Sequence, residues 1–129
     1  IIALKSFPED GTVLATSYPA KIAERLMKQN VMALGSNGIV GPQRMTDILR
    51  ALSGSTLPLC ILPDIAIPTL YEGRPRYNAE PDYVASVAIK LVRQGAAIIG
   101  ADGGATVEHI KAIADVAMEF KPRQILETI

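Results

Sequence analysis

Tryptophan is absent from this sequence, cysteine occurs once, and neither sign of charge is in excess. Thirteen Lys and Arg residues balance thirteen Asp and Glu residues without a long basic run, so we do not expect nucleic acid as a partner. The single cysteine, Cys60, excludes an internal disulfide and a site built from several thiolates. Because such sparse cysteine use fits a reducing compartment, we expect the protein in the cytoplasm.

Long hydrophobic runs are also absent. The apolar runs are far shorter than the roughly 20 residues that span a bilayer, and no signal peptide is recognisable, so we expect a soluble protein that does not contact membranes. With 129 residues, 49% of them apolar, the chain can form one domain with a hydrophobic core. It starts without a methionine and inside an apolar segment, from which we expect it to be part of a longer chain.

Short apolar segments rich in β-branched residues alternate with longer segments of helical periodicity, which is typical of βα units and a parallel sheet. We predict strands at 1–7, 31–35, 57–62 and 96–100, and helices at 17–29, from 42, from about 83 to 95, and from 106 to before 122. The strand at 57–62 is nearly all apolar, which indicates a central position in the sheet. The proline-containing segment 63–80 is predicted to be a long loop. The α/β chain, residues 1–129, is a single segment of four such units, which fits either a small open sheet or half of an eight-stranded barrel.

In both architectures, ligand-facing groups follow the carboxyl ends of the strands, here positions 5–7, 35–42, 63–68 and 101–106. Asn37, Asp64 and Asp102 lie in these positions and could together hold a small amino or hydroxyl ligand. Each could instead be a solvated loop residue or a helix cap. The two loops 35–42 and 100–106 are rich in glycine, including Gly103 and Gly104, and could bind an anion through backbone amides or simply permit tight turns.

Other reactive side chains have plain structural interpretations. His109 lies one turn into the last predicted helix, where packing or exposure to solvent is the usual role and catalysis is the alternative. Cys60 lies in an apolar strand and is expected to be a core residue rather than a nucleophile, because no sequence neighbour lowers its pKa. Tyr71 and Tyr77, in the segment 63–80, could line a pocket or cover one.

At the two glycine-rich loops the sequence resembles the homocysteine S-methyltransferase family of zinc-dependent (β/α)8 barrels. ALGSNGIVGPQRM is similar to the family pattern GxNCxxGP, and IIGADGGATVEHIKAIA is similar to IVGGCCGTTPEHIRAIA. Between them, LPLCILPDIAIP, followed by Gly73 and Tyr77, is similar to the PNAGxP segment and its downstream Gly and Tyr. These segments follow the family's order over nearly the whole chain, but they match only its last βα units. The resemblance therefore implies the C-terminal half of a TIM barrel, completed by a missing N-terminal half or by self-association.

The resemblance also implies a zinc ion, held by three thiolates, that stabilises the thiolate of homocysteine. At the matching positions this sequence has Gly38, Asp102 and Gly103, and Cys60 lies on the strand before a matching loop. We therefore predict that the zinc site is lost, and we predict no cofactor. Asn37 and Asp64, which stand at polar positions of the family's substrate pocket, are the carried-over candidates.

The resemblance implies a homocysteine S-methyltransferase-like domain that transfers a methyl group to a thiol or related small acceptor, as in methionine biosynthesis. Its predicted substrate-binding residues are Asn37, Asp64, Asp102, Gly103 and Gly104. The charge of Asp102 opposes ionisation of a nearby thiol and so favours a cationic or amine-bearing ligand. The alternatives are a non-catalytic barrel scaffold and a binding module for a small anionic or phosphorylated ligand.

Overall fold

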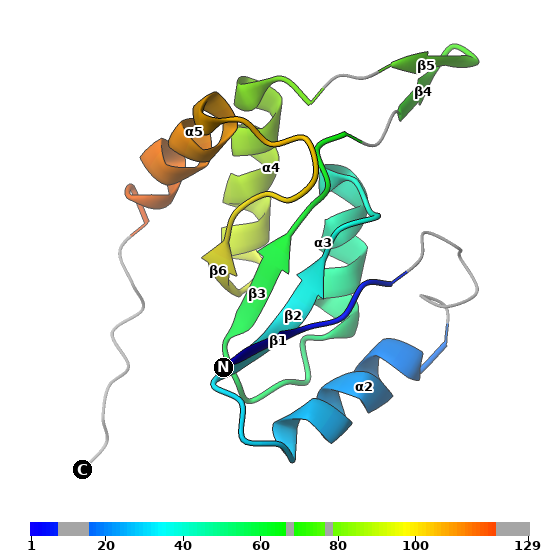
Figure 1. The fold of residues 1–129 in the computed structure, drawn as a ribbon, viewed down its shortest axis with the longest axis vertical. Coiled ribbons are helices and arrows are strands. Elements are labelled where there is room, and N and C mark those ends of the chain that lie inside the picture. Colours follow the sequence, from blue (N-terminus) through cyan, green and yellow to red (C-terminus); the bar gives the residue numbers. More distant parts are fainter. Residues whose placement is uncertain (8–15, 67–68, 77–78, 121–129) are drawn as a thin grey trace.

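A computed structural model describes residues 1–7, 16–66, 69–76 and 79–120 of the chain (Figure 1). Its main sheet has four strands, β1 (Ile2–Leu4), β2 (Ala33–Asn37), β3 (Leu59–Leu62) and β6 (Ala96–Ile99), in the order β1-β2-β3-β6. Every neighbouring pair is parallel, which confirms the predicted α/β class. The apolar strand β3 lies between β2 and β6, so its predicted central position is confirmed as well.

Four helices alternate with these strands: α2 (Tyr18–Met27), α3 (Pro42–Ala51), α4 (Pro81–Arg93) and α5 (Val107–Ala117). The first three carry a proline at the first or second helical position. Proline is tolerated there because the first amides of a helix have no intrahelical acceptor. Several boundaries differ from the prediction. The strand β1 is confined to Ile2–Leu4 and α2 ends at Met27, while β2 is shifted from 31–35 to Ala33–Asn37 and β3 begins at Leu59 rather than at 57. No helix in the described ranges is long and apolar enough to cross a membrane.

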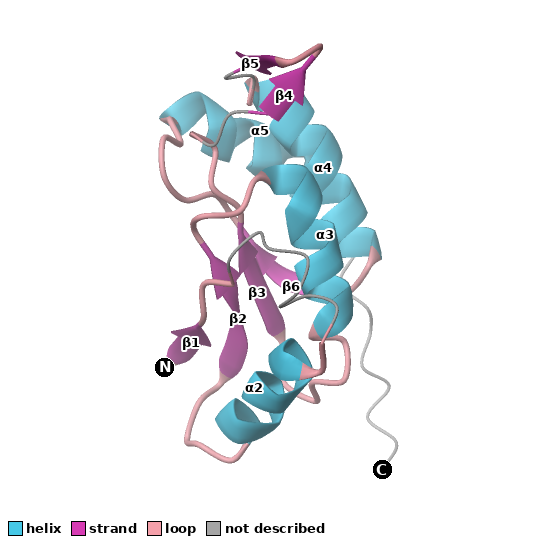
Figure 2. Cartoon of the chain, turned by 90° about the vertical axis from the view of Figure 1, so that its right-hand side faces the viewer, coloured by secondary structure: helices cyan, strands magenta, loops and turns pink. Residues whose placement is uncertain are grey.

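The segment 63–80, predicted to be a loop throughout, contains an antiparallel hairpin of β4 (Thr69–Tyr71) and β5 (Arg74–Arg76). Its two turn residues, Glu72 and Gly73, have φ angles of +50° and +72°. Positive φ at both central residues is the geometry that suits the twist of a two-residue hairpin. Figures 1 and 2 show that the hairpin lies away from the main sheet, past the carboxyl ends of its strands.

The main core fills the space between the sheet and the helices α2, α3 and α4, which lie on one side of it (Figure 2). Strand residues Leu34, Leu59 and Ile61 pack there with helix residues such as Leu49 and Leu91. A smaller cluster of Ile65, Val84, Ala88 and Ile113 joins the loop after β3 to α4 and α5. Burying one such aliphatic side chain contributes about 1.5–3 kcal/mol, so both clusters fix the strand ends relative to the helices.

The opposite face of the sheet leaves the apolar side chains of its two edge strands partly in solvent. Ile2 pairs with Ala33, and Gly35 pairs with Cys60, which in turn pairs with Ile98, so these residues share the face opposite Leu34. Ile2 is 50% exposed and Ile98 37% exposed. In the described part of the chain, β1 and β6 each pair with one strand only, and the sheet does not close. The half-barrel interpretation thus stays a prediction.

Candidate functional site

Three predicted site residues lie at the carboxyl ends of neighbouring strands. Asn37 is the last residue of β2, Asp64 follows β3, and Asp102 follows β6. The Asn37 side chain donates a hydrogen bond from Nδ2 to Oδ2 of Asp102, at 2.9 Å. The loops after β2 and β6 therefore meet beyond the carboxyl end of the central strand β3.

Gly38 lies directly beside the hydrogen bond between Asn37 and Asp102. A Cβ atom at this position would lie 3.4 Å from Oδ2 of Asp102 and 3.9 Å from Oγ of Ser6. Ser6 donates a hydrogen bond of 2.9 Å to the backbone oxygen of Asn37, which brings the end of β1 into the same cluster. Ser6 falls within the predicted strand-end positions 5–7, but a lone hydroxyl has no distinctive sequence signal that marks it as a site residue.

Asp64 is held against Gly103. A Cβ atom at position 103 would lie 2.9 Å from Oδ2 and 3.1 Å from Oδ1 of Asp64. The carboxylate is fixed there because Oδ1 accepts a hydrogen bond from the amide of Ala66, at 2.8 Å. It therefore fills the space in which a side chain of residue 103 would begin.

Backbone hydrogen bonds bind the strand-end loops together. Asp64 donates its amide proton to Val40, and Asp102 donates its amide proton to Pro63, at 2.9 and 2.8 Å. The amides of Ile65 and Ala66 both donate to the oxygen of Gly103. The three polar side chains thus start from a backbone whose positions are fixed by contacts with neighbouring loops.

Close packing also explains why glycine occurs at position 104. Its φ is +78°, and a Cβ atom there would lie 2.9 Å from Cβ of Ala66. Glycine is favoured where the backbone takes such angles and approaches another segment closely. This agrees with the tight-turn interpretation of the loop 100–106, whereas binding of an anion stays a prediction.

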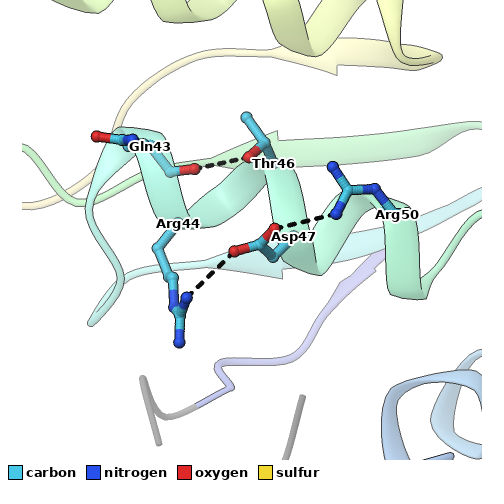
Figure 3. Close-up of polar contacts among 5 residues, drawn as sticks. All are labelled: Gln43, Arg44, Thr46, Asp47 and Arg50. Carbon is cyan, nitrogen blue, oxygen red and sulfur yellow. Dashed lines mark hydrogen bonds and ion pairs between the residues drawn. The ribbon is translucent and has the colours of Figure 1, made fainter. Parts of the chain in front are cut away.

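The two site carboxylates have no ion-pair partner among residues 1–7, 16–66, 69–76 and 79–120. The ion pairs found there lie on helices: Asp47 of α3 with Arg44 and Arg50, and Asp115 of α5 with Lys111 (Figure 3 shows the α3 pairs). The site therefore presents two acidic groups and one amide without a neutralising side-chain cation. Such a site attracts cations and opposes the ionisation of a thiol brought next to it.

The residues present do not fit the three-thiolate zinc site that the resemblance implies. Of the matching positions, Asp102 alone offers a side-chain ligand, and its Oδ2 is engaged by Asn37. Within the described ranges, no group of three or more His, Cys, Asp or Glu residues is placed to hold a metal ion. Cys60 is buried in β3, as predicted for a core residue, and burial raises the pKa of its thiol. We therefore derive no chemistry through zinc.

His109 is buried rather than exposed, in agreement with a packing role. Its Nδ1 accepts a hydrogen bond from the amide of Thr106, at 3.1 Å, and its Nε2 contacts the backbone oxygen of Ala79. Next to it, Glu108 is fully exposed, and hydrogen bonds from its own backbone amide and from Thr106 lower its pKa. Tyr71 and Tyr77 are predicted to line or cover a pocket. The side chain of Tyr71 and the whole of Tyr77 lie outside the described part of the chain, so this stays a prediction.

The family comparison covers the whole fold. A sequence model described as homocysteine S-methyltransferase matches residues 2–117, which run from the start of β1 to the end of α5. No match among curated proteins accompanies it. The matched range includes all three polar strand-end residues and the glycines that pack against them, and we conclude that the chain belongs to the homocysteine S-methyltransferase family.

Proposed function

We propose that this chain forms the acceptor side of an S-methyltransferase-type site that works without a thiolate-bound zinc ion. Its substrate is a small thiol or related acceptor that also carries a protonated amine. The observation that carries this proposal is the pair of carboxylates, Asp64 and Asp102, at strand ends with no ion-pair partner in the described part of the chain. A protonated amine supplies the missing positive charge and several hydrogen-bond donors.

The reaction needs a second substrate that provides an activated methyl group, such as a sulfonium compound. A bond forms between the acceptor sulfur and the methyl carbon while the bond from that carbon to the donor sulfur breaks. The bonding electron pair stays on the donor, and the acceptor's proton leaves to water. Asp102 does not help this ionisation, since a nearby negative charge raises a thiol pKa above its usual value of about 8.5. The carboxylates therefore serve to bind and orient the amine end of the acceptor.

Loss of the zinc site is part of the proposal. Gly38 and Gly103 offer no ligand atoms on a side chain, and the carboxylate of Asp64 lies where a side chain of residue 103 would begin. After equilibration with Zn²⁺ and gel filtration, we expect the protein to retain no stoichiometric zinc. One zinc ion per chain, removable only by a strong chelator, would overturn this part of the proposal.

The decisive experiment compares two ligands that differ in one group. Homocysteine carries the thiol, the carboxylate and the amine, whereas 4-mercaptobutyrate lacks only the amine. Titration calorimetry should show homocysteine binding at least tenfold more tightly, because only homocysteine can pair with the carboxylates. Equal affinities would contradict amine recognition. Tighter binding of inorganic phosphate than of either thiol would instead favour the anion-binding module, and absence of any binding would favour the scaffold.

We further propose that the open sheet is completed by additional βα units, either in a longer chain or in a second copy of this one. The support is the row of apolar side chains on the uncovered face, with Ile2 and Ile98 partly in solvent. A closed barrel of eight strands buries this face in its interior. The same closure would place the strand-end loops around a common pocket mouth.

A further inference from the structure

We propose that His109 is a positioning residue. Its side chain holds the C-terminal end of the segment 63–80, which carries the hairpin of β4 and β5, against α5, the helix that follows the Asp102 loop. The proposed function enters only in assigning these loops to the substrate site. The fastening itself can be measured without any substrate.

Both ring nitrogens of His109 are engaged, and their partners define its protonation. Nδ1 accepts the amide proton of Thr106, so Nδ1 itself carries no proton. The hydroxyl oxygen of Thr106 lies 2.8 Å from the same nitrogen, beside the amide bond. Nε2 must then carry the ring proton and donate it to the carbonyl of Ala79. The ring is therefore a neutral linker with one acceptor side and one donor side, and it is only 9% exposed.

The acceptor nitrogen, Nδ1, binds the start of α5. Thr106 is the residue before the first turn of this helix, and His109 is the third residue within it. A side chain at this place commonly returns to accept the amide proton of the capping residue, usually through Glu or Gln. A carboxylate could make that bond but could not donate a proton to Ala79. Histidine, in its Nε2-protonated form, can do both.

The donor side reaches the end of the segment that carries β4 and β5. Ala79 lies between this hairpin and α4, which begins at Pro81. The beginning of the same segment is also fastened to the Asp102 loop, because Ile65 and Ala66 donate to the oxygen of Gly103 at 2.9 and 3.0 Å. Both ends of the segment 63–80 are thus hydrogen-bonded to one short stretch of chain, which consists of the loop after β6 and the first turn of α5. Figure 1 shows the hairpin carried beyond these attachment points.

This arrangement couples the hairpin to the candidate site. The first attachment follows directly after Asp64, and its acceptor, Gly103, follows directly after Asp102. Without the second attachment at His109, the Ala79 end of the segment would lose its hydrogen bond to α5 and keep only its packing in the small apolar cluster and its connection to α4 among the contacts described. The expected consequence is faster opening of the Ala79 end and weaker ligand binding, with little change in α5 itself.

The test uses the difference between the two sides of the ring. In His109→Glu the carboxylate keeps the acceptor for the Thr106 amide and loses the donor to Ala79. We expect native-state hydrogen exchange at 79–84, read chiefly at the Val84 amide that donates to the oxygen of Glu80, to become at least tenfold faster, while the amides of α5 keep their wild-type protection. His109→Gln, whose amide nitrogen can donate to Ala79, should restore part of the protection at 79–84. Val107→Ala, at a position in the same helical turn that is 80% exposed, is the control and should change neither region.

A second measurement does not depend on any variant folding. His109 is the single histidine of the chain, so its ring signals are unambiguous in a nitrogen-correlated NMR spectrum. At neutral pH we expect a proton on Nε2 and none on Nδ1. A proton on Nδ1, or unchanged exchange at 79–84 in His109→Glu, would overturn the proposal. So would an equal loss of protection in α5, which would indicate a purely structural role. Failure of the wild-type chain to bind an amine-bearing thiol would refute the proposed function and leave the exchange result unaffected.

Discussion

Asn37 and Asp102 are 65 positions apart in the sequence, and their side chains are joined by a hydrogen bond of 2.9 Å. The contact exists because β2 and β6 flank β3 in one parallel sheet, so that their carboxyl ends lie at the same edge. The amide donates to one carboxylate oxygen and leaves the negative charge of Asp102 unneutralised. Because a neutral amide is its partner, Asp102 keeps its charge for a ligand, and substitution of Asp102 should have the clearest effect on ligand binding.

Asp102→Asn should weaken binding of homocysteine about tenfold and leave binding of 4-mercaptobutyrate unchanged. A hydrogen bond to a charged group is worth about 1.5–3 kcal/mol, and a tenfold change in affinity, about 1.4 kcal/mol, lies at the lower end of this range, as expected for a half-buried carboxylate. Calorimetric titration of both ligands measures the effect. Asp115→Asn, on the exposed ion pair with Lys111 of α5, is the matched control. An equal loss of affinity for both thiols would show that Asp102 shapes the pocket without recognising the amine.

Adding one methyl group at position 103 should destabilise the protein by about 1–3 kcal/mol, the usual effect of overpacking a fixed site. The Cβ atom of Gly103→Ala would meet the carboxylate of Asp64 at 2.9 and 3.1 Å. The free energy of unfolding in urea measures this effect. Gly54→Ala, where an added Cβ has no neighbour within 4 Å, is the control and should be nearly neutral.

The same clash can be isolated with a double-mutant cycle. Asp64→Ala removes the carboxylate, so Gly103→Ala should be much less destabilising in that background than in the wild type. Residues in direct contact typically show coupling energies of about 0.5–3 kcal/mol. Additive effects of the two substitutions would mean that Asp64 moves aside freely, so that position 103 could accommodate a side-chain ligand.

The apolar face of the sheet leads to a prediction about association. The 129-residue chain should sediment as a concentration-dependent oligomer, and Ile98→Asp should shift it toward the monomer. Met118→Asp is the control, because Met118 is 84% exposed just after α5, away from that face. A stable, well-folded monomer of the unchanged chain would contradict self-association and leave a longer chain as the way to complete the sheet.

Sequence reasoning predicted the features that follow from periodicity. Parallel βα units place the ends of strands at one edge, which was enough to bring Asn37 and Asp102 into one site. It missed the hairpin, because Glu72-Gly73 is a weaker turn signal than Asn-Gly and the strands beside it are only three residues long. It could not find the contacts between Asp64 and Gly103 or between His109 and Ala79. Each depends on how closely two loops approach, which no local pattern records.

Cys60 gives the stability of the protein a pH dependence of known sign. Burial in β3 disfavours the thiolate and raises the pKa of the folded thiol, whereas in the unfolded chain it ionises near its usual value of about 8.5. Its contribution to stability is therefore complete below that value and is lost as the pH rises toward the folded pKa. As the pH rises above about 8.5, the free energy of unfolding should fall more steeply for the wild type than for Cys60→Ala, by at most about 1.4 kcal/mol per pH unit.

The comparison of slopes separates this titration from the packing role of the side chain. Cys60→Ala removes the sulfur from a site that is only 3% exposed, so it should lower stability at every pH. Cys60→Ser places a hydroxyl there that does not titrate in this range, and its curve should run parallel to that of Cys60→Ala. If the wild-type curve were parallel to both, the thiol would ionise equally in the folded and unfolded chains. Cys60 would then be accessible to water in the folded protein, and its exclusion as a nucleophile or metal ligand would have to be withdrawn.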